Sequence, residues 1–367
     1  MLVEEFDYIL PQELIAQKPS AKRAGSKMEV LNKDTKTIEN KHFFDIVDYL
    51  NENDVLVLNN TKVIPARLFG QKVTGANLEV FLLKELKDKK WEALVKPSKR
   101  VNPGNIIKIS PELTITTIKH IEGGKWLVQL GYVGKIQDIL ERTGNVPLPP
   151  YIERKTPTEE LKKLDYKRYQ TVFAKHEGSV AAPTAGLHFT KDILKKLEEK
   201  GVKICYVTLN VGLGTFRPVK CEKITDHKME TETFEIPEET AEIINKAKKE
   251  GKKIVAVGTT SVRTLETCFE EHGKIQACKG SSQLFIYPPY EFKVVDKLIT
   301  NFHLPKSTLL MLVCAFGGRG KCGGGGKCGD KCGGRDNGGK DFIFEAYKQA
   351  IEKKYRFYSY GDCMFIY

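Results

Sequence analysis

One loop of the sequence combines residue types that suit an anion site. Gly258, Thr259, Thr260, Ser261 and Arg263 follow directly after the apolar segment KIVAV. A strand that runs into a Gly/Thr/Ser turn and then a helix points free backbone N–H groups at one place, at the edge of an α/β sheet where ligands bind. The Arg263 guanidinium can clamp a carboxylate or a phosphate. The alternative is an ordinary helix start with Arg263 on its surface, and the residues alone favour neither.

A second loop, after the segment CYVTLN, carries Gly212, Gly214 and Arg217. Two glycines allow the backbone to approach a ligand closely. An isolated Gly-x-Gly is a weak signal, however, and a structural turn is the alternative.

Three histidines lie in polar loops and are candidates for proton transfer. His188 stands just ahead of an expected helix start, where the positive end of the helix dipole disfavours imidazolium. A neutral imidazole is a suitable acid or base near neutral pH. His227 and His303 lie in similar surroundings, and for each the alternative is a structural histidine. The sequence contains no HxH, HExxH or CxxC, so we predict no metal site.

The charge balance of the chain suits a polyanionic partner. The formal net charge is +12, of which residues 319–340 supply +4 through six Lys or Arg against two Asp. Lys and Arg bind nucleic-acid phosphates by displacing condensed counterions. Many Lys-rich enzymes without a nucleic-acid partner are equally basic, so charge alone leaves both alternatives open.

Apolar runs and the start of the chain argue against a membrane protein. The longest strongly apolar run, LLMLVCAF at 309–316, is far shorter than the ~20 residues of a membrane span. The opening MLVEEFDYIL is acidic, whereas a secretory signal is basic and then apolar. We expect a cytoplasmic protein with no membrane contact.

Three stretches of the chain differ in their hydrophobic pattern. Residues 1–59 contain a hairpin-like pair and the apolar segment DVLVLN, and residues 60–150 consist of short strand-like runs separated by turn residues. From residue 151 onwards helix and strand patterns alternate. We therefore predict the α/β class: a mixed sheet with flanking helices, formed by 1–59 and 151–367. A smaller antiparallel β-barrel-like domain at 60–150 interrupts it.

The candidate loops belong to a longer series of segments with a family resemblance. These segments are LNNTKVIPARL (58–68), RYQTVFA (168–174), GSVAAPTAGLHFT (178–190), VTLNVGLGTFRPV (207–219), VGTTSVRTLE (257–266), LITNFHLPKSTLLMLVCAF (298–316) and YRFYSYGDCMFI (355–366). Through them the chain resembles the S-adenosylmethionine:tRNA ribosyltransferase-isomerase family of queuosine biosynthesis along nearly its whole length.

The resemblance implies an unusual use of S-adenosylmethionine, which donates its ribosyl portion instead of its methyl group. The acceptor is 7-aminomethyl-7-deazaguanine at the wobble position of a tRNA anticodon, and the products are epoxyqueuosine-tRNA, adenine and methionine. The sulfonium acidifies the C5′ hydrogens, so a base can start the reaction there. The implied partners are the tRNA anticodon arm and S-adenosylmethionine, with no metal or redox cofactor. We expect a monomer.

The resemblance also implies roles for the candidate residues. The proton-transfer groups are His188 and His303, with Glu232 and His227 as second choices. The loop Gly258 to Ser261 and Arg263 hold the methionine carboxylate or an RNA phosphate. The remaining residues contact the donor (Gly212, Gly214 and Arg217) or the anticodon arm (Lys62 and Arg67).

Two positions depart from the family pattern. Many members have His where this chain has Asn210, and Asn210 cannot act as a base. Many also have His in the segment that here reads Met229 to Glu232, where Glu230 can substitute as a polar or proton-accepting group. One rival hypothesis is an RNA-binding protein that has lost catalysis, and Asn210 favours it. Another is an ordinary methyltransferase, which releases S-adenosylhomocysteine and no adenine.

The Gly-, Cys- and Lys-rich segment at about 318–340 is an insertion that the family normally lacks. Cys322, Cys328 and Cys332 are spaced CxxxxxCxxxC, which provides neither four ligands nor a CxxC pair. The alternatives are a flexible surface insertion, a metal or redox site, and a basic loop that contacts RNA.

We expect the enzyme to work without this insertion. Deleting 319–340 should leave turnover close to that of the full chain, because the helical pattern resumes in the family's register after it. Steady-state kinetics of the deletion variant test this expectation. Abolished turnover in a folded deletion variant would contradict it.

Overall fold

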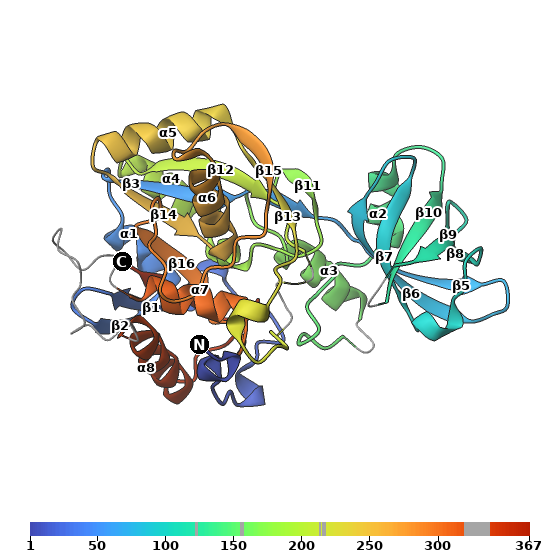
Figure 1. Cartoon of the computed structure of the whole chain (residues 1–367), viewed down its shortest axis with the longest axis horizontal. Coiled ribbons are helices and arrows are strands. Elements are labelled where there is room, and N and C mark those ends of the chain that lie inside the picture. Colours follow the sequence, from blue (N-terminus) through green and yellow to red (C-terminus); the bar gives the residue numbers. More distant parts are fainter. Residues whose placement is uncertain (122–123, 155–157, 213, 215–217, 319–337) are drawn as a thin grey trace.

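The computed structural model of this chain describes residues 1–121, 124–154, 158–212, 214, 218–318 and 338–367. These residues form a body built on one nine-stranded sheet and, set to one side of it, a closed six-stranded barrel (Figure 1). The predicted class, an α/β fold interrupted by a smaller antiparallel barrel, is confirmed.

Four parallel strands form the centre of the large sheet. They are β12 (Lys203–Leu209), β3 (Asp54–Asn59), β14 (Lys253–Val257) and β16 (Lys297–Asn301), in this spatial order. All six residues of β3 are buried, because helices cover both faces of the sheet. The carboxyl ends of these four strands meet at one edge, which is where α/β proteins place their ligands.

Five further strands extend the sheet on both sides. β13 (Glu232–Ile236) and β15 (Cys278–Ser282) add antiparallel strands beyond β12. On the other side β17 (Cys363–Ile366) pairs antiparallel with β16, followed by β1 (Lys27–Asn32) and β2 (Thr37–His42).

Helices pack on the two faces of the sheet through separate apolar clusters. α1 (Ile46–Tyr49) and α4 (Lys191–Glu199) belong to one cluster. The other contains residues of α5 (Glu238–Lys249), α6 (Thr259–His272), α7 (Thr308–Phe316) and α8 (Gly338–Glu352). Thr190 caps α4 by accepting a hydrogen bond from the Ile193 amide.

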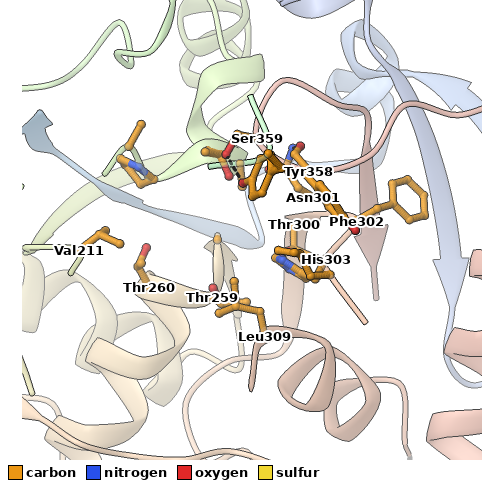
Figure 2. Close-up of a pocket in the computed structure, with 17 residues that line it drawn as sticks. Val211, Thr259, Thr260, Thr300, Asn301, Phe302, His303, Leu309, Tyr358 and Ser359 are labelled. Carbon is orange, nitrogen blue, oxygen red and sulfur yellow. Dashed lines mark hydrogen bonds between the residues drawn. The ribbon is translucent and has the colours of Figure 1, made fainter. Parts of the chain in front are cut away.

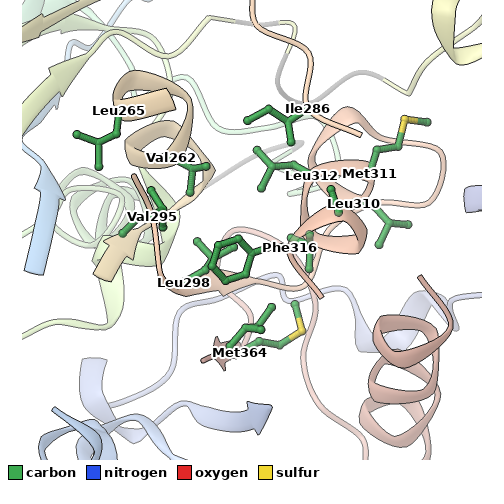
Figure 3. Packing of buried hydrophobic residues seen from close by; sticks show 14 of the residues in the cluster. Val262, Leu265, Ile286, Val295, Leu298, Leu310, Met311, Leu312, Phe316 and Met364 are labelled. Atoms are coloured by element: carbon green, nitrogen blue, oxygen red, sulfur yellow. The ribbon is translucent and has the colours of Figure 1, made fainter. Parts of the chain in front are cut away.

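The apolar run at 309–316 forms most of α7 and is buried, as its composition indicated. Phe316 of α7 packs with Val262 of α6, Leu298 of β16 and Met364 of β17 in this core (Figure 3). No helix in the described part of the chain is long and apolar enough to span a bilayer. α6 packs on β14 and α7 packs on α6, which sets the starts of both helices near the carboxyl ends of the central strands.

The barrel closes through antiparallel pairs only, in the order β10-β7-β6-β5-β8-β9. Its strands are β5 (Arg67–Lys72), β6 (Asn77–Glu85), β7 (Lys90–Lys96), β8 (Ile106–Ser110), β9 (Leu113–His120) and β10 (Lys125–Gly131). Ile136, Ile139 and Leu140 of α2 (Ile136–Thr143) join the barrel core.

Short elements connect the barrel to the body. β4 (Thr61–Val63) pairs with β11 (His176–Ser179), and α3 (Glu159–Arg168) lies between the two parts (Figure 1). The limits predicted for the inserted domain stay a prediction; residue 60 lies between β3 and β4, and residue 150 between α2 and α3.

Candidate active site

A pocket lies at the carboxyl ends of the central strands, as the topology requires (Figure 2). We call it the strand-end pocket, and its enclosed volume is about 40 Å³. Its lining comes from segments that are far apart in the chain: Tyr151, Ala182 to Ala185, Val211, Gly258 to Thr260, Thr300 to Leu304, Leu309, Tyr358 and Ser359.

Two buried polar atoms that line this pocket have no hydrogen-bond partner in the described part of the chain. They are Oγ1 of Thr260 and Oδ1 of Asn301. Burying an unpaired polar group costs about 1–3 kcal/mol, so native proteins rarely leave two in one place without a ligand. Thr260 and Asn301 are therefore candidates for binding a polar ligand in this pocket.

The start of α6 forms one wall of the strand-end pocket. Gly258 precedes the helix with φ +85°, a conformation that favours glycine, and its amide donates to the Ile299 carbonyl at 2.8 Å. The first backbone N–H groups of a helix have no partner within the helix. In α6 these groups belong to the residues directly after Gly258, and Thr259 and Thr260 among them line the pocket. Ser261 is already engaged, because its hydroxyl donates to the Val257 carbonyl at 2.8 Å. Thr259 and Thr260 therefore carry the anion-binding prediction.

His303 lies in the lining as a neutral imidazole. Its Nε2 is 2.8 Å from Oγ1 of Thr300, and its backbone amide donates to the Tyr347 hydroxyl at 2.9 Å. Tyr8 donates to the His303 carbonyl at 2.5 Å, which fixes the residue from both sides. Burial lowers the pKa of His303 to about 3, so the ring is uncharged at neutral pH.

His188 lies behind the pocket and contacts it through Asn301. Asn301 Nδ2 is 3.3 Å from Nε2 of His188, and an amide nitrogen can only donate, so Nε2 is the unprotonated nitrogen. Nδ1 therefore carries the hydrogen and donates it to Oγ of Ser26 at 2.8 Å. Burial, together with the charges of Arg356 and Arg23, lowers the pKa of His188 to about 3. Both ring nitrogens of this neutral histidine are thus held by protein groups.

A second, smaller pocket adjoins His188 on its other side, and we call it the arginine pocket. Its lining is Pro19, Ser20, Arg23, Ser26, Arg168, Leu187, His188, Ser359, Tyr360 and Gly361. Ser359 therefore lines both pockets. No local sequence pattern predicts this pocket, because its two arginines, Arg23 and Arg168, are far apart in the chain.

The two arginines of this pocket are held by carbonyl groups and by no carboxylate among the described residues. Arg23 donates to the carbonyls of Leu187, Lys167 and Gln170, and Arg168 to those of Ser20 and Ala21. Nε of Arg168 is buried without a partner.

The charges of these arginines consequently remain uncompensated. Burial and the neighbouring charge of Arg168 lower the pKa of Arg23 to about 10, which still leaves both groups cationic. The pocket therefore presents positive charge to an incoming anion.

Arg263 and Glu232 form a buried ion pair outside the strand-end pocket. NH1 of Arg263 donates to Oε2 of Glu232, and its Nε donates to the Leu284 carbonyl at 3.1 Å. The other oxygen of Glu232 accepts from the Gly212 amide at 2.8 Å. Arg263 is 5% exposed, which excludes the alternative of a surface residue. In this structure Arg263 and Glu232 bind each other. The anion-binding role of Arg263 and the proton-transfer role of Glu232 therefore stay predictions.

The neighbouring loop is held in a similar way. The Gly214 amide donates to Oε2 of Glu230 at 3.2 Å, and a Cβ at position 214 would meet Cδ of Glu230 at 2.9 Å. Arg217 lies outside the described residues. His227 is apart from both pockets, with its ring against Phe285, and burial lowers its pKa.

Asn210, directly after β12, is held by side-chain hydrogen bonds to β4 and β13. Thr61 donates to its Oδ1 at 2.9 Å, and its Nδ2 donates to the Thr233 hydroxyl at 3.3 Å. The side chain acts here as a bridge between strands and lies outside the lining of the strand-end pocket.

The two residues predicted to contact tRNA lie near the barrel and both carry ion pairs. Lys62 is 2.8 Å from Glu177, and Arg67 binds Glu79 with Nε 2.8 Å from Oε1. Arg67 also lines a cleft of about 760 Å³ between barrel and body. Arg142, Arg154, Lys162 and Lys163 line the same cleft together with the carboxylates of Glu159 and Asp165, so its lining carries more positive than negative charge.

One set of three described side chains is close enough to hold a metal ion, and it lies away from both pockets. Cys268, His272 and Cys278 form it at the end of α6 opposite to Thr259.

Comparisons with known proteins identify what the chain is similar to. The family model "Queuosine biosynthesis protein" matches residues 3–323 and 337–366. An S-adenosylmethionine:tRNA ribosyltransferase-isomerase from Sulfurihydrogenibium sp. (strain YO3AOP1) is 53% identical over all 367 residues, and one from Thermosipho melanesiensis is 49% identical, each covering 100% of both chains. The crystal structure of an S-adenosylmethionine tRNA ribosyltransferase from Thermotoga maritima is 35% identical, covers 99% of this chain and 100% of its own, and has a TM-score of 0.53.

The two buried histidines predict how stability depends on pH. Both pKa values fall from 6.5 to about 3 on folding, so between these values the unfolded chain binds more protons. The free energy of unfolding should therefore rise with pH between about 3 and 6.5, and the contribution of the two histidines should reach its full value above about pH 6.5. The rise should be at most about 1.4 kcal/mol per pH unit and histidine. Urea unfolding of wild type and His303→Gln at about pH 5 and pH 7 measures it. Equal pH slopes in the two proteins would contradict the assignment.

Proposed function

The chain belongs to the queuosine biosynthesis protein family, and from this we propose that it is a ribosyl-transferring and isomerising enzyme acting on tRNA. It moves the ribosyl moiety of S-adenosylmethionine onto 7-aminomethyl-7-deazaguanine at the wobble position and releases adenine and methionine. The observation that carries this proposal is the 53% identity, over the full length of both chains, to a relative bearing the name of that activity. We place the reaction in the cytoplasm, with a monomeric enzyme.

The strand-end pocket is our site for one end of the donor. Its enclosed volume of about 40 Å³ is far below the ~300–1,000 Å³ of pockets that surround a whole small molecule, so only an end of the donor enters. The methionine carboxylate suits it, because the N–H groups at the start of α6 and the unpaired Thr260 hydroxyl can donate to an anion. The unpaired Asn301 oxygen can accept from the methionine ammonium group.

His303 is the better placed of the two histidines for proton transfer. It lines the pocket, so we assign it the proton transfer from the acidified C5′ carbon and to the departing adenine. For this role the bound donor has to raise the pKa of the imidazole from about 3 towards neutrality. His188 has both ring nitrogens engaged, and we assign it the positioning of Asn301. These steps transfer only protons, and we propose that no metal or redox cofactor takes part.

The arginine pocket is our site for a backbone phosphate of the tRNA. Arg23 and Arg168 bring two positive charges and no compensating carboxylate among the described residues, and Nε of Arg168 lacks a partner. A guanidinium that still has a free N–H donates well to phosphate. Because Ser359 lines both pockets, a phosphate here lies next to the donor site. The basic cleft between barrel and body then takes the rest of the anticodon arm.

A protein that binds tRNA without catalysis is the second candidate, and Asn210 favours it. The position of that side chain argues for the enzyme. Asn210 bridges Thr61 and Thr233 and lies outside the strand-end pocket lining, so the chemistry assigned to His303 does not use it.

Adenine release tests the proposed reaction directly. The chain should release adenine and methionine from S-adenosylmethionine only with tRNA that carries the aminomethyl-deazaguanine base. Chromatography of the products, with unmodified tRNA as control, measures this. Tight tRNA binding without adenine would favour the binding-protein candidate, and S-adenosylhomocysteine without adenine would establish a methyltransferase.

Salt dependence of tRNA binding tests the arginine pocket. Arg168→Gln should weaken tRNA binding about fivefold and lower the slope of log K against log salt by about 0.7–0.9, the value for one lost phosphate contact. Arg168→Lys keeps the charge and should keep most of the slope. Lys195→Gln, on the exposed surface of α4, is the matched control and should change neither.

An unchanged salt slope in a folded Arg168→Gln variant would remove the phosphate from this pocket. Weaker binding of S-adenosylmethionine in the absence of tRNA would instead assign the pocket to the donor carboxylate.

A further inference from the structure

Three soft metal-binding side chains converge where α6 ends and β15 begins. Cys268 and His272 are four residues apart on α6 and therefore share one face of the helix. Gly273 ends the helix in the left-handed conformation (φ 69°), which turns the chain back towards Cys278, the first residue of β15. The three donor atoms, two thiol sulfurs and one ring nitrogen, all lie within 4.8 Å of one another.

The separation of the two sulfurs matches a shared metal ion. Sγ of Cys278 is 3.7 Å from Sγ of Cys268. Two thiolates at ~2.3 Å from a tetrahedral zinc ion lie about 3.8 Å apart, whereas a disulfide requires about 2.05 Å. Two thiols in simple contact also lie near this distance. The imidazole of His272 distinguishes the two cases, because the helical spacing from Cys268 brings a third metal-binding atom close to the two sulfurs. Simple packing of two thiols does not require such a third ligand.

The chemistry of the set selects the metal. Two thiolates and an imidazole suit zinc, whereas magnesium and calcium require oxygen ligands. The Glu271 carboxylate is 3.8 Å from Nε2 of His272, so a negative charge also faces the site. Cys268 is buried, while the His272 side chain is 31% exposed, which gives an ion access from solvent.

We propose that Cys268, His272 and Cys278 form a zinc site that fastens the end of α6 to β15. On binding, both thiols lose their protons to solvent and coordinate the ion as thiolates, and water completes the fourth position. The site is independent of the proposed reaction, because the ion lies at the opposite end of α6 from the strand-end pocket.

The proposed ion would stabilise the framework around the active site. α6 starts at the strand-end pocket and carries Arg263, while β15 pairs with β13, which carries Glu232. A link between α6 and β15 therefore closes a ring that contains the buried ion pair. Zinc in about 100-fold excess over its dissociation constant should raise the melting temperature by about 3 °C for a chain of this size.

Zinc stoichiometry of the full chain tests the proposal. The measurements use a background in which Cys322, Cys328 and Cys332 are replaced by Ser, so that the thiols of the insertion cannot contribute. After reduction, loading and dialysis against metal-free buffer, this protein should retain about one zinc per chain. Cobalt in place of zinc should give the thiolate-to-metal charge-transfer band in the near ultraviolet.

Single substitutions in the same background identify the ligands. Cys278→Ser, at a partly exposed position, should abolish zinc retention and the cobalt band, and His272→Ala should weaken zinc binding at least about tenfold. Cys221→Ser, which removes a partly exposed thiol elsewhere, is the matched control and should retain the zinc. Circular dichroism checks that each variant is folded.

Two results would overturn the zinc site. One is a background protein that retains no zinc although the thiols of Cys268 and Cys278 are shown to be reduced. The other is zinc retention that persists in Cys278→Ser. Neither bears on the ribosyl transfer, which adenine release measures separately.

Discussion

The buried ion pair between Arg263 and Glu232 constrains the arrangement of the whole site. A charge cannot be buried in a protein interior without a partner, so Arg263 on α6 and Glu232 on β13 must meet for either element to pack. The second oxygen of Glu232 then holds the amide of Gly212, and the Nε of Arg263 holds the carbonyl of Leu284. One interaction thus fixes a helix, a strand and two loops relative to one another, and the start of α6 is set beside the strand ends as a consequence.

Around this frame the protein separates neutral from charged groups. The strand-end pocket contains a neutral histidine and two unpaired polar atoms, whereas the positive charges of Arg23 and Arg168 lie in the adjacent arginine pocket. His188 and Asn301 stand between the two regions and keep their hydrogen bonds on both sides. A sulfonium donor and a polyanionic acceptor need different surroundings, and this division supplies one for each.

The sequence predicted those features that depend on local pattern. Alternation of helix and strand and the turn-rich stretch before residue 150 both depend on neighbouring residues, and the fold confirms both. The Gly258 loop is a local pattern as well, and the structure places it in the lining of the strand-end pocket. Contacts between distant segments could not be predicted in this way. No shared sequence pattern links Arg23 with Arg168, and no residue near Arg263 in the sequence indicates that Glu232 is its partner. Cys268, His272 and Cys278 escaped notice because their spacing follows a helix turn and a loop and matches no short metal motif.

The way in which the chain enters and leaves the barrel has a consequence for how the protein folds. The amides of Arg67 and Asn145 each donate to the carbonyl of the other, at 3.1 and 2.8 Å, so the two ends of the barrel segment meet in one backbone bridge. The body must bring β3 next to β12 across all of this intervening chain. Closing a loop of about 80 residues costs roughly 4 kcal/mol of chain entropy, and a barrel that has already folded removes most of that cost. A folded barrel thus lowers the entropic cost of pairing β3 with β12, the two central strands that lie on either side of the barrel in the sequence.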